Sequence, residues 1–442
     1  MQLPWQQLLS TQRSGHQTRS EHDRRNPFET DLDRITFSTP FRRLKDKTQV
    51  HALPDNDHVR NRLTHSLETA SVGRSLGVLA GDRLCDRSGH CEGLTPPHFG
   101  YVVQAACLAH DIGNPPFGHA GEDAIRSWFK QNSTVLADLT EPQRLDFLHF
   151  EGNAQGFRIL TQLEYGRREG GLRLTHGVLA AFSKYPRSAR PVTGLGAGQR
   201  KNGLYQSELD QFSQVAHTTG LRQVAQQAWQ RHPMAYLMEA ADDICYAPID
   251  LEDGFELGWI PFDHIQALLA PIAQFEPRNR GSQLEQVRFL RTMAITKLIE
   301  AAVDQFVTHL PAIMQGTYPH TLLESSPLAQ AVKTAKQAAR HSIFNHEAVL
   351  LRIATGHRVL TGLLDMFYPV FMRLHQAAWQ VQALPTYERH LAQLLGQDLL
   401  QTLQAQPTQD LYAALQTLTD TISAMTDGQA MRLFRRLNGI QL

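Results

Sequence analysis

The stretch CLAHDIGNPPFGHAGE, residues 107–122, decides how the rest of this sequence is interpreted. An apolar segment leads into His110 and Asp111, and Gly113 followed by two prolines prevents a helix from continuing. The sequence therefore predicts a buried helix that presents two metal-binding side chains at its C-terminal end. For an isolated pair, a histidine beside the helix dipole and an aspartate that starts a turn would be the better explanation.

Two further segments carry side chains of the same kind. His65 lies in RNRLTHSLE, residues 60–68, where the leucine spacing predicts a helix with one face toward the core. Asp242 lies in the apolar segment MEAADDICY, residues 238–246, and an ionised aspartate there is costly to bury unless it is paired or binds a cation. Imidazole and carboxylate ligands suit Mn, Fe, Co or Mg, with water completing the coordination. We therefore expect a divalent metal site formed by His65, His110, Asp111 and Asp242.

Apolar residues recur at helical spacing over most of the chain after Pro27, and alternating strand patterns are scarce, so we expect an all-α fold. Residues 86–98 contain glycines and a Pro-Pro pair and are expected to form a surface loop. The expected helices cover residues 60–83, 100–109, 122–130, 153–162, 175–181 and 233–247, then regions near 284–315, 328–337, 346–366, 368–382, 385–405 and 409–437.

Composition excludes several classes of protein. The chain has 442 residues, more than the roughly 100–200 of a typical domain. Lys+Arg and Asp+Glu both count 43, which argues against a nucleic-acid coat protein or a polybasic membrane binder. The 21 histidines favour metal or acid–base chemistry. Four cysteines without a CxxC pair and a start without a signal peptide predict a cytoplasmic protein, and no apolar run reaches the roughly 20 residues that cross a bilayer.

The sequence around these residues resembles the HD-domain phosphohydrolases, and most closely the deoxyguanosine triphosphate triphosphohydrolases (dGTPases) and their dGTPase-like relatives. HDIGNPPFGHAGE is far more specific than a bare His-Asp pair, and Asn114 stands where cyclic-dinucleotide phosphodiesterases of the superfamily carry a lysine. The matching segments are NPFETDLDRITFSTPFRRLKDKTQV (26–50), RNRLTHSLETASVGR (60–74), AHDIGNPPFGHAGE (109–122), FEGNAQGFRIL (150–160), EAADDICYAPIDLEDG (239–254), FNHEAVLLRIATGHRVL (344–360) and AMTDGQAMRLFRRL (424–437).

The resemblance implies an HD-domain helical fold with a helical C-terminal extension packed on the same core. We expect a loose polar arm at 1–25 and a single HD-domain unit at 26–442. Within that unit we expect an HD core at about 60–255, a flexible insertion at about 186–205 and a helical C-terminal region at about 260–442.

The implied reaction is the hydrolysis of a deoxynucleoside triphosphate (dNTP), dGTP or another, to a deoxynucleoside and inorganic triphosphate. Water attacks the α-phosphorus, and a divalent cation neutralises the phosphate charge. The four predicted ligands match the ligand positions of the family. Asp242 matches better than Asp243, because the family has a tyrosine four residues and an aspartate eight residues after its ligand, as at Tyr246 and Asp250.

His119 and Glu122 match the acid–base pair of the family. Residues three apart at a helix start can face one another, so that the carboxylate orients the imidazole. The alternative for Glu122 is a helix-capping role.

Residues that select the sugar also match the family. Gln49 and Asp250 correspond to residues that bind the 3′-hydroxyl, and Tyr246 corresponds to a ring that packs under the deoxyribose and excludes a 2′-hydroxyl. The alternative is that Tyr246 is a core aromatic and Gln49 a solvated loop residue.

Several polar residues match positions that line the substrate pocket. Arg62 lies one helical turn before His65 and could reach phosphates held at the metal. Lys201 resembles a phosphate-contacting lysine. The remaining matches are His149, Asn153 and Asn345, the last preceded by Phe344. The alternative for His149 is a histidine with a purely structural role in the core.

Two other functions stay open at this point. One is a 5′-nucleotidase that acts on deoxynucleoside monophosphates, and the other is a non-catalytic sensor of nucleotides or single-stranded DNA. The resemblance further implies a homo-oligomer, either a tetramer or a hexamer, and an allosteric dNTP or single-stranded DNA as an additional partner. Base preference among dNTPs is left open.

Overall fold

The computed structural model describes residues 4–15, 25–49, 60–88, 91, 93–164, 170–194, 196–275, 281–404 and 410–440. The described chain is mostly helical, as predicted, and its first half contains α1 (Trp5–Leu8), α2 (Pro27–Thr36), α3 (Thr39–Arg43), α4 (Arg62–Ser88), α5 (Pro96–Ala109), α6 (His119–Gln131), α7 (Glu141–Leu148), α8 (Gly152–Arg158), α9 (His176–Phe182) and α10 (Leu209–Thr219). A short antiparallel hairpin, β1 (Gln223–Ala225) with β2 (Ala228–Trp229), follows α10.

The second half is helical as well. It contains α11 (Pro233–Glu256), α12 (Phe262–Ala273), α13 (Gln283–Thr308), α14 (Leu310–Met314), α15 (Ala329–Ala339), α16 (Glu347–Gln376), α17 (Thr386–Leu394), α18 (Gln397–Gln404), α19 (Leu411–Ser423) and α20 (Asp427–Leu437). None of the described helices combines the length and apolar character needed to cross a membrane.

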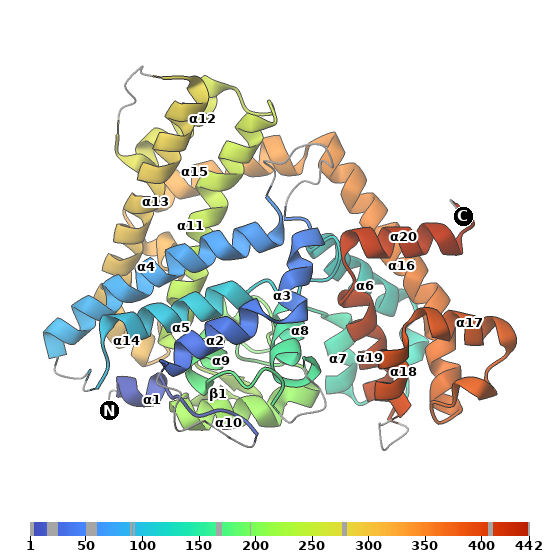
Figure 1. Cartoon of the computed structure of the whole chain (residues 1–442). Coiled ribbons are helices and arrows are strands. Elements are labelled where there is room, and N and C mark those ends of the chain that lie inside the picture. The colour runs from blue at the N-terminus through green and yellow to red at the C-terminus, as the bar shows by residue number, and fades with distance from the viewer. Residues whose placement is uncertain are drawn as a thin grey trace.

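The helices α4, α5 and α11 pack against one another in the centre of the molecule, with α12 and α13 on one side and α16–α20 on the other (Figure 1). α4 and α5 approach very closely: a Cβ added at Gly77 would lie 2.6 Å from the Phe99 carbonyl oxygen. Because glycine leaves room for this contact, the helix ends that carry His65 and His110 can meet the middle of α11.

A second group of buried side chains lies between α6, α16 and α19, and includes Phe129, Leu363, Phe367 and Leu415. α6 starts at His119, so the C-terminal helices support the segment that carries the predicted acid–base pair. The prediction of a helix break between residues 366 and 368 is wrong. α16 continues through Pro369, because buried residues on both sides of the proline fix the helix against its neighbours.

Residues 4–15 correct the expectation of a loose arm. Trp5 and Leu8 are buried and Arg13 pairs with Asp31, so this segment is part of the core. Residues 1–3 and 16–24 of the expected arm lie outside the described residues, as does residue 195 of the expected insertion. The ends of that insertion are packed, with Ser188 and Leu204 buried, and its flexibility stays a prediction.

Candidate metal and active site

The four predicted metal ligands come from three different helices. His65 lies in the first turn of α4, His110 and Asp111 directly follow α5, and Asp242 lies in the middle of α11. The turn after α5 is forced by the glycine and prolines, so both side chains stay at the helix end.

The ligand atoms of His65, His110 and Asp111 all lie within 4.8 Å of one another. Asp242 joins them, because its Oδ1 is 3.2 Å from His65 Nε2 and 3.7 Å from His110 Nε2. His110 Nε2 is 3.6 Å from Asp111 Oδ1. Neighbouring ligands bound at about 2.1 Å in octahedral geometry are about 3 Å apart, so this arrangement fits a divalent cation.

The ring tautomer of His110 also fits a metal ligand. Its Nδ1 is 2.6 Å from the Cys107 carbonyl oxygen, which assigns the ring proton to Nδ1. Nε2 then carries a lone pair, and it is buried without a hydrogen-bond partner. A ring nitrogen held in this way by a backbone carbonyl is the usual arrangement for histidines that bind metals.

Asp111 is surrounded by positive groups and donors. Arg62 Nη1 donates to Asp111 Oδ2 at 2.7 Å, and the Asn114 side-chain amide donates to Oδ1. Burial alone would raise the pKa of Asp111, but the charge of the neighbouring Arg62 outweighs it and holds the pKa below its ordinary value. The carboxylate is therefore kept ionised, as a metal ligand must be.

The predicted acid–base residues are in contact at the start of α6. His119 Nδ1 is 2.7 Å from Glu122 Oε2, and Glu122 Oε1 accepts from the Gly152 amide at 2.7 Å. Glu122 is buried, whereas the His119 side chain is 74% exposed. Burial would raise the pKa of Glu122, but the hydrogen bond and charge of His119 lower it, as does Lys201. A buried, ionised carboxylate thus orients an imidazole that solvent and ligands can reach.

Lys201 lies beside this pair. Its Nζ is 3.0 Å from Glu151 Oε2 and 3.9 Å from Glu122 Oε2. Asn153 Nδ2 makes a long contact of 3.4 Å with the same Glu151 carboxylate. The structure therefore places Lys201 and Asn153 next to the predicted acid–base pair.

The predicted sugar-binding residues contain two buried atoms without partners in the described part of the chain, Gln49 Oε1 and Asp250 Oδ2. Burial raises the pKa of Asp250, with Asp253 adding to the effect. Tyr246 stacks on Phe344 with ring centroids 5.9 Å apart. Unpaired polar atoms of this kind are costly unless a ligand or water satisfies them.

Two predicted pocket residues lie at the surface. The side chains of His149 and Asn345 are exposed. Asn345 directly follows Phe344, the residue that stacks on Tyr246.

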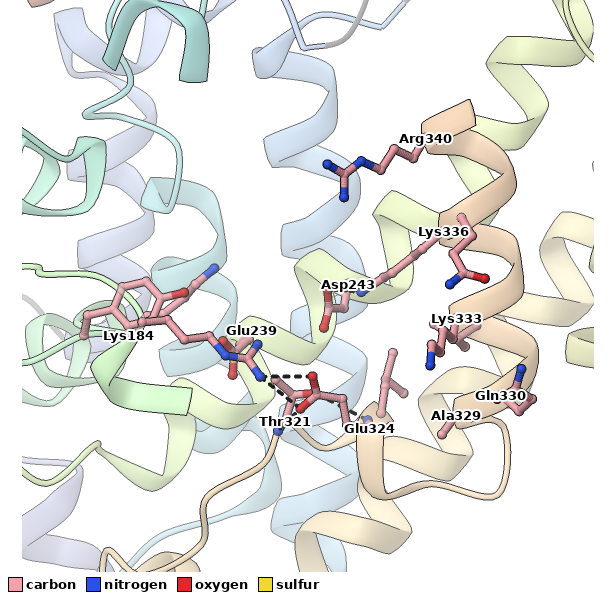
Figure 2. A pocket seen from close by; sticks show the side chains of 15 residues that line it. Lys184, Glu239, Asp243, Thr321, Glu324, Ala329, Gln330, Lys333, Lys336 and Arg340 are labelled. Atoms are coloured by element: carbon pink, nitrogen blue, oxygen red, sulfur yellow. Dashed lines mark hydrogen bonds and ion pairs between the residues drawn. The ribbon is translucent and has the colours of Figure 1, made fainter. Parts of the chain in front are cut away.

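A cavity of about 600 Å³ is lined by five basic side chains and by the carboxylates of Glu239, Asp243 and Glu324 (Figure 2), and Lys184 is its link to the ligand cluster. Lys184 joins the two sites, because it lines the cavity while its Nζ is 3.5 Å from Asp242 Oδ2. In Figure 2, Lys336 and Arg340 come from α15 and its π-helical end and lie on the other side of Asp243 from Lys184. Lys336 Nζ is 2.6 Å from Asp243 Oδ1. The basic residues of the lining are Lys184, Arg200, Lys333, Lys336 and Arg340.

These basic residues were not predicted from the sequence. Lys333, Lys336 and Arg340 are spaced three and four residues apart, so one helix face carrying three cations was the available signal. Nothing in the sequence indicated that this face would lie opposite Lys184.

Known proteins match the chain over its full length. The HD domain family matches residues 62–168. A protein of Synechocystis sp. named deoxyguanosinetriphosphate triphosphohydrolase-like protein is 42% identical over the whole of both chains. A Pseudomonas aeruginosa protein of the same name is 42% identical over 99% of both chains. A protein of Enterobacter sp. named deoxyguanosinetriphosphate triphosphohydrolase is 32% identical over 97% of both.

Proposed function

This chain belongs to the family of HD-domain deoxyguanosinetriphosphate triphosphohydrolase-like proteins, and from that premise we propose that it hydrolyses dNTPs to a deoxynucleoside and inorganic triphosphate. The reaction would be the attack of water at the α-phosphorus. dGTP is one substrate, and other dNTPs are included in the proposal.

The observation that carries this proposal is the cavity beside the ligand cluster, in which five cations outnumber three carboxylates. A triphosphate bears up to four negative charges, and lysine and arginine side chains are the usual groups that bind phosphates. Lys184 touches both Asp242 and the cavity. An α-phosphate held at the ligand cluster would therefore leave its β- and γ-phosphates among the cavity's cations.

The residues fit a divalent cation, and Mn, Mg, Fe and Co are the candidates. His65, His110, Asp111 and Asp242 would hold it. When bound, such a cation neutralises phosphate charge and lowers the pKa of water. Arg62 would keep Asp111 ionised and correctly oriented through the hydrogen bond to Oδ2.

The acid–base work would fall to His119. Glu122 holds its Nδ1, which leaves Nε2 free to carry the proton that moves to the leaving 5′ oxygen or from the attacking water. The exposure of His119 supports this role, because the ring must reach a bound substrate.

Sugar selection would depend on Gln49, Tyr246 and Asp250. The 3′-hydroxyl, which has one proton, would donate to one of the two unpartnered oxygens, Gln49 Oε1 or Asp250 Oδ2. The Tyr246 ring, fixed by stacking on Phe344, would leave no room for a 2′-hydroxyl. His149, Asn153, Lys201 and Asn345 would contact other parts of the substrate. A homo-oligomer, tetrameric or hexameric, and an allosteric dNTP or single-stranded DNA belong to the proposal through the family resemblance alone.

A product assay tests the proposal. The protein with Mg²⁺ or Mn²⁺ is mixed with each of the four dNTPs, with GTP as the ribonucleotide control and a dNMP as the nucleotidase substrate. Triphosphate, pyrophosphate and orthophosphate are then resolved. We expect triphosphate from at least one dNTP and none from GTP. Orthophosphate from the dNMP alone would instead make the protein a 5′-nucleotidase, and no turnover with every activator added would make it a sensor.

Lys336→Met tests the role of the cavity in the same assay. Loss of one phosphate-binding cation should raise KM for the dNTP by roughly 10-fold, a loss of about 1.4 kcal/mol in binding. Lys297→Met is the matched control, because Lys297 pairs with Glu300 on the exposed face of α13. An unchanged KM in the Lys336 variant would contradict phosphate binding in this cavity.

A further inference from the structure

Asp427, the first residue of α20, bridges two loops that lie far from it in the sequence. Its Oδ1 accepts from the Phe117 amide at 2.9 Å. Its Oδ2 accepts from the Thr48 hydroxyl at 2.7 Å and from the Thr48 amide at 3.3 Å. One carboxylate from the C-terminal helix therefore fastens both loops.

Both loops belong to the proposed active site. Thr48 directly precedes Gln49, the residue proposed to bind the sugar. Phe117 lies two residues before His119, the residue proposed to move the proton. A displacement of either loop would move a group that must meet the substrate.

Phe117 has an uncommon backbone conformation, with φ of 63°. A side chain other than glycine is strained there and stays in place only where its surroundings hold it. Two features of the C-terminal half hold Phe117 in this conformation. Asp427 binds the Phe117 amide, and Gly356 of α16 leaves space for the Phe117 ring, since a Cβ at Gly356 would lie 2.6 Å from Phe117 Cγ.

Lys47 adds a second link between the same regions. It directly precedes Thr48, is buried, and its Nζ donates to the carbonyl oxygens of Asn114 and Ser423. Asn114 in turn donates to the proposed metal ligand Asp111. The segment from the end of α19 to the start of α20 thus touches both loops at several points.

We infer that Asp427 is a positioning residue. It holds the loop of Thr48 and Gln49 and the loop of Phe117 and His119 at a fixed separation, so that one substrate can meet both. This inference rests on the proposed function. It gives a role to the segment AMTDGQAMRLFRRL at residues 424–437, to which the predicted site residues assign none.

Steady-state kinetics of Asp427→Ala test the catalytic consequence. With the Asp427 bonds to both loops removed, kcat for a dNTP should fall by roughly 10- to 100-fold, because a displacement of about 1 Å at a reacting group costs that much. The preference for a dNTP over its NTP should fall as well, since the Gln49 loop is no longer fixed against the sugar. A merely structural role would lower the melting temperature and leave this preference intact.

Gln429→Ala is the matched control. Gln429 Oε1 accepts from the Thr426 amide, and the two residues form the capping box of α20. Its loss weakens the same helix start but removes no bond to either loop. We expect a lower melting temperature with unchanged kcat and unchanged sugar preference.

Hydrogen exchange separates this inference from the proposed function, because it needs no turnover. Peptides that cover residues 44–49 and 112–122 should both exchange faster in Asp427→Ala than in the wild type, and neither should change in Gln429→Ala. Faster exchange in only one peptide, or in neither, would overturn the bridging role. Faster exchange in both with unchanged kcat and sugar preference would overturn the catalytic role. A wild-type protein that hydrolyses no dNTP would refute the proposed function while the exchange data still decide whether Asp427 couples the loops.

Discussion

Two of the clusters of buried ionisable side chains in the described part of the chain differ in how their charges are satisfied. The ligand cluster joins α4, α5 and α11 and consists of His65, His110, Asp111 and Asp242. The second, which we call the helix clamp, joins α7, the end of α8 and the residue before α10 to α19 and consists of Asp146, Arg158, Glu208, Tyr412 and Asp420.

In the helix clamp the protein supplies its own counterion. Arg158 donates to Asp420 at 2.9–3.1 Å and to Glu208 at 2.7 Å. Asp146 instead accepts from the Tyr412 hydroxyl at 2.6 Å and from the Gln206 amide at 2.8 Å. Burial raises the pKa of Asp146 to about 7, with Glu208 adding to the effect, so this carboxyl favours its neutral form.

The ligand cluster has the opposite character. Its carboxylates are held ionised, and His110 Nε2 has a lone pair and no partner. Burial of charge is therefore not in itself a sign of function. Both clusters contain an arginine–carboxylate pair and both leave buried atoms without partners among the described residues; what separates them is the kind of atom, a histidine nitrogen with a lone pair in the ligand cluster and single oxygens of Asp146 and Glu208 in the helix clamp.

His110→Ala should have the largest effect. We expect at least a roughly 10³-fold loss of kcat/KM, because the metal contribution of several kcal/mol to transition-state stabilisation would be lost. Bound metal, measured by elemental analysis after dialysis, should fall with it. The control is His232→Ala, since both ring nitrogens of His232 are engaged, one with the Leu8 carbonyl and one with the Met234 amide. An equal loss of metal in the His232 variant would contradict the distinction between a buried histidine with an unpartnered nitrogen and one with both nitrogens hydrogen-bonded.

Arg158→Met should have the next largest effect, on stability and not on metal. Two buried carboxylates would lose their counterion, which costs about 3–5 kcal/mol of unfolding free energy. Urea denaturation measures this loss, and metal content per folded molecule should stay constant. Arg83→Met is the control, because the Arg83–Asp304 pair is exposed and worth at most about 1 kcal/mol. A similar loss in both variants would show that the clamp contributes little.

Asp146→Asn should have the smallest effect, visible as a change in pH dependence. The folded pKa of about 7 lies above the ordinary value of 3.8, so the stabilisation from this group is present at acid pH and is lost as pH rises through about 7. The asparagine variant keeps an acceptor for Tyr412 and Gln206 without ionising. The difference in unfolding free energy, variant minus wild type, should therefore increase by roughly 1 kcal/mol per pH unit between pH 5 and 7. Asp138→Asn, an exposed site with the same charge change, should show no such trend.

The two clusters also differ in how well the sequence predicts them. The mainly α-helical class and the helices α4, α5 and α11 follow from apolar periodicity, and the glycine and prolines after Asp111 predict where α5 ends. Helix ends near prolines were less predictable. α16 passes through Pro369 because packing on both sides outweighs the lost hydrogen bond.

The helix clamp could not be predicted from the sequence. Arg158 and Asp420 are 262 residues apart, and neither lies in a pattern that distinguishes a buried ion pair from an exposed one. The same holds for Trp5 and Leu8, whose polar neighbours suggested a loose arm although both are buried.

The sequence by itself determined the residue types that can bind a metal and move a proton. Local spacing presents His65, His110, Asp111, His119 and Glu122 at helix ends and Asp242 within an apolar helix. Only the tertiary structure decided that Lys184 would face Lys336 across a cavity and that Asp427 would join Thr48 to Phe117. Helical periodicity records which face of a segment is buried, but it carries no information about which distant segment lies against that face.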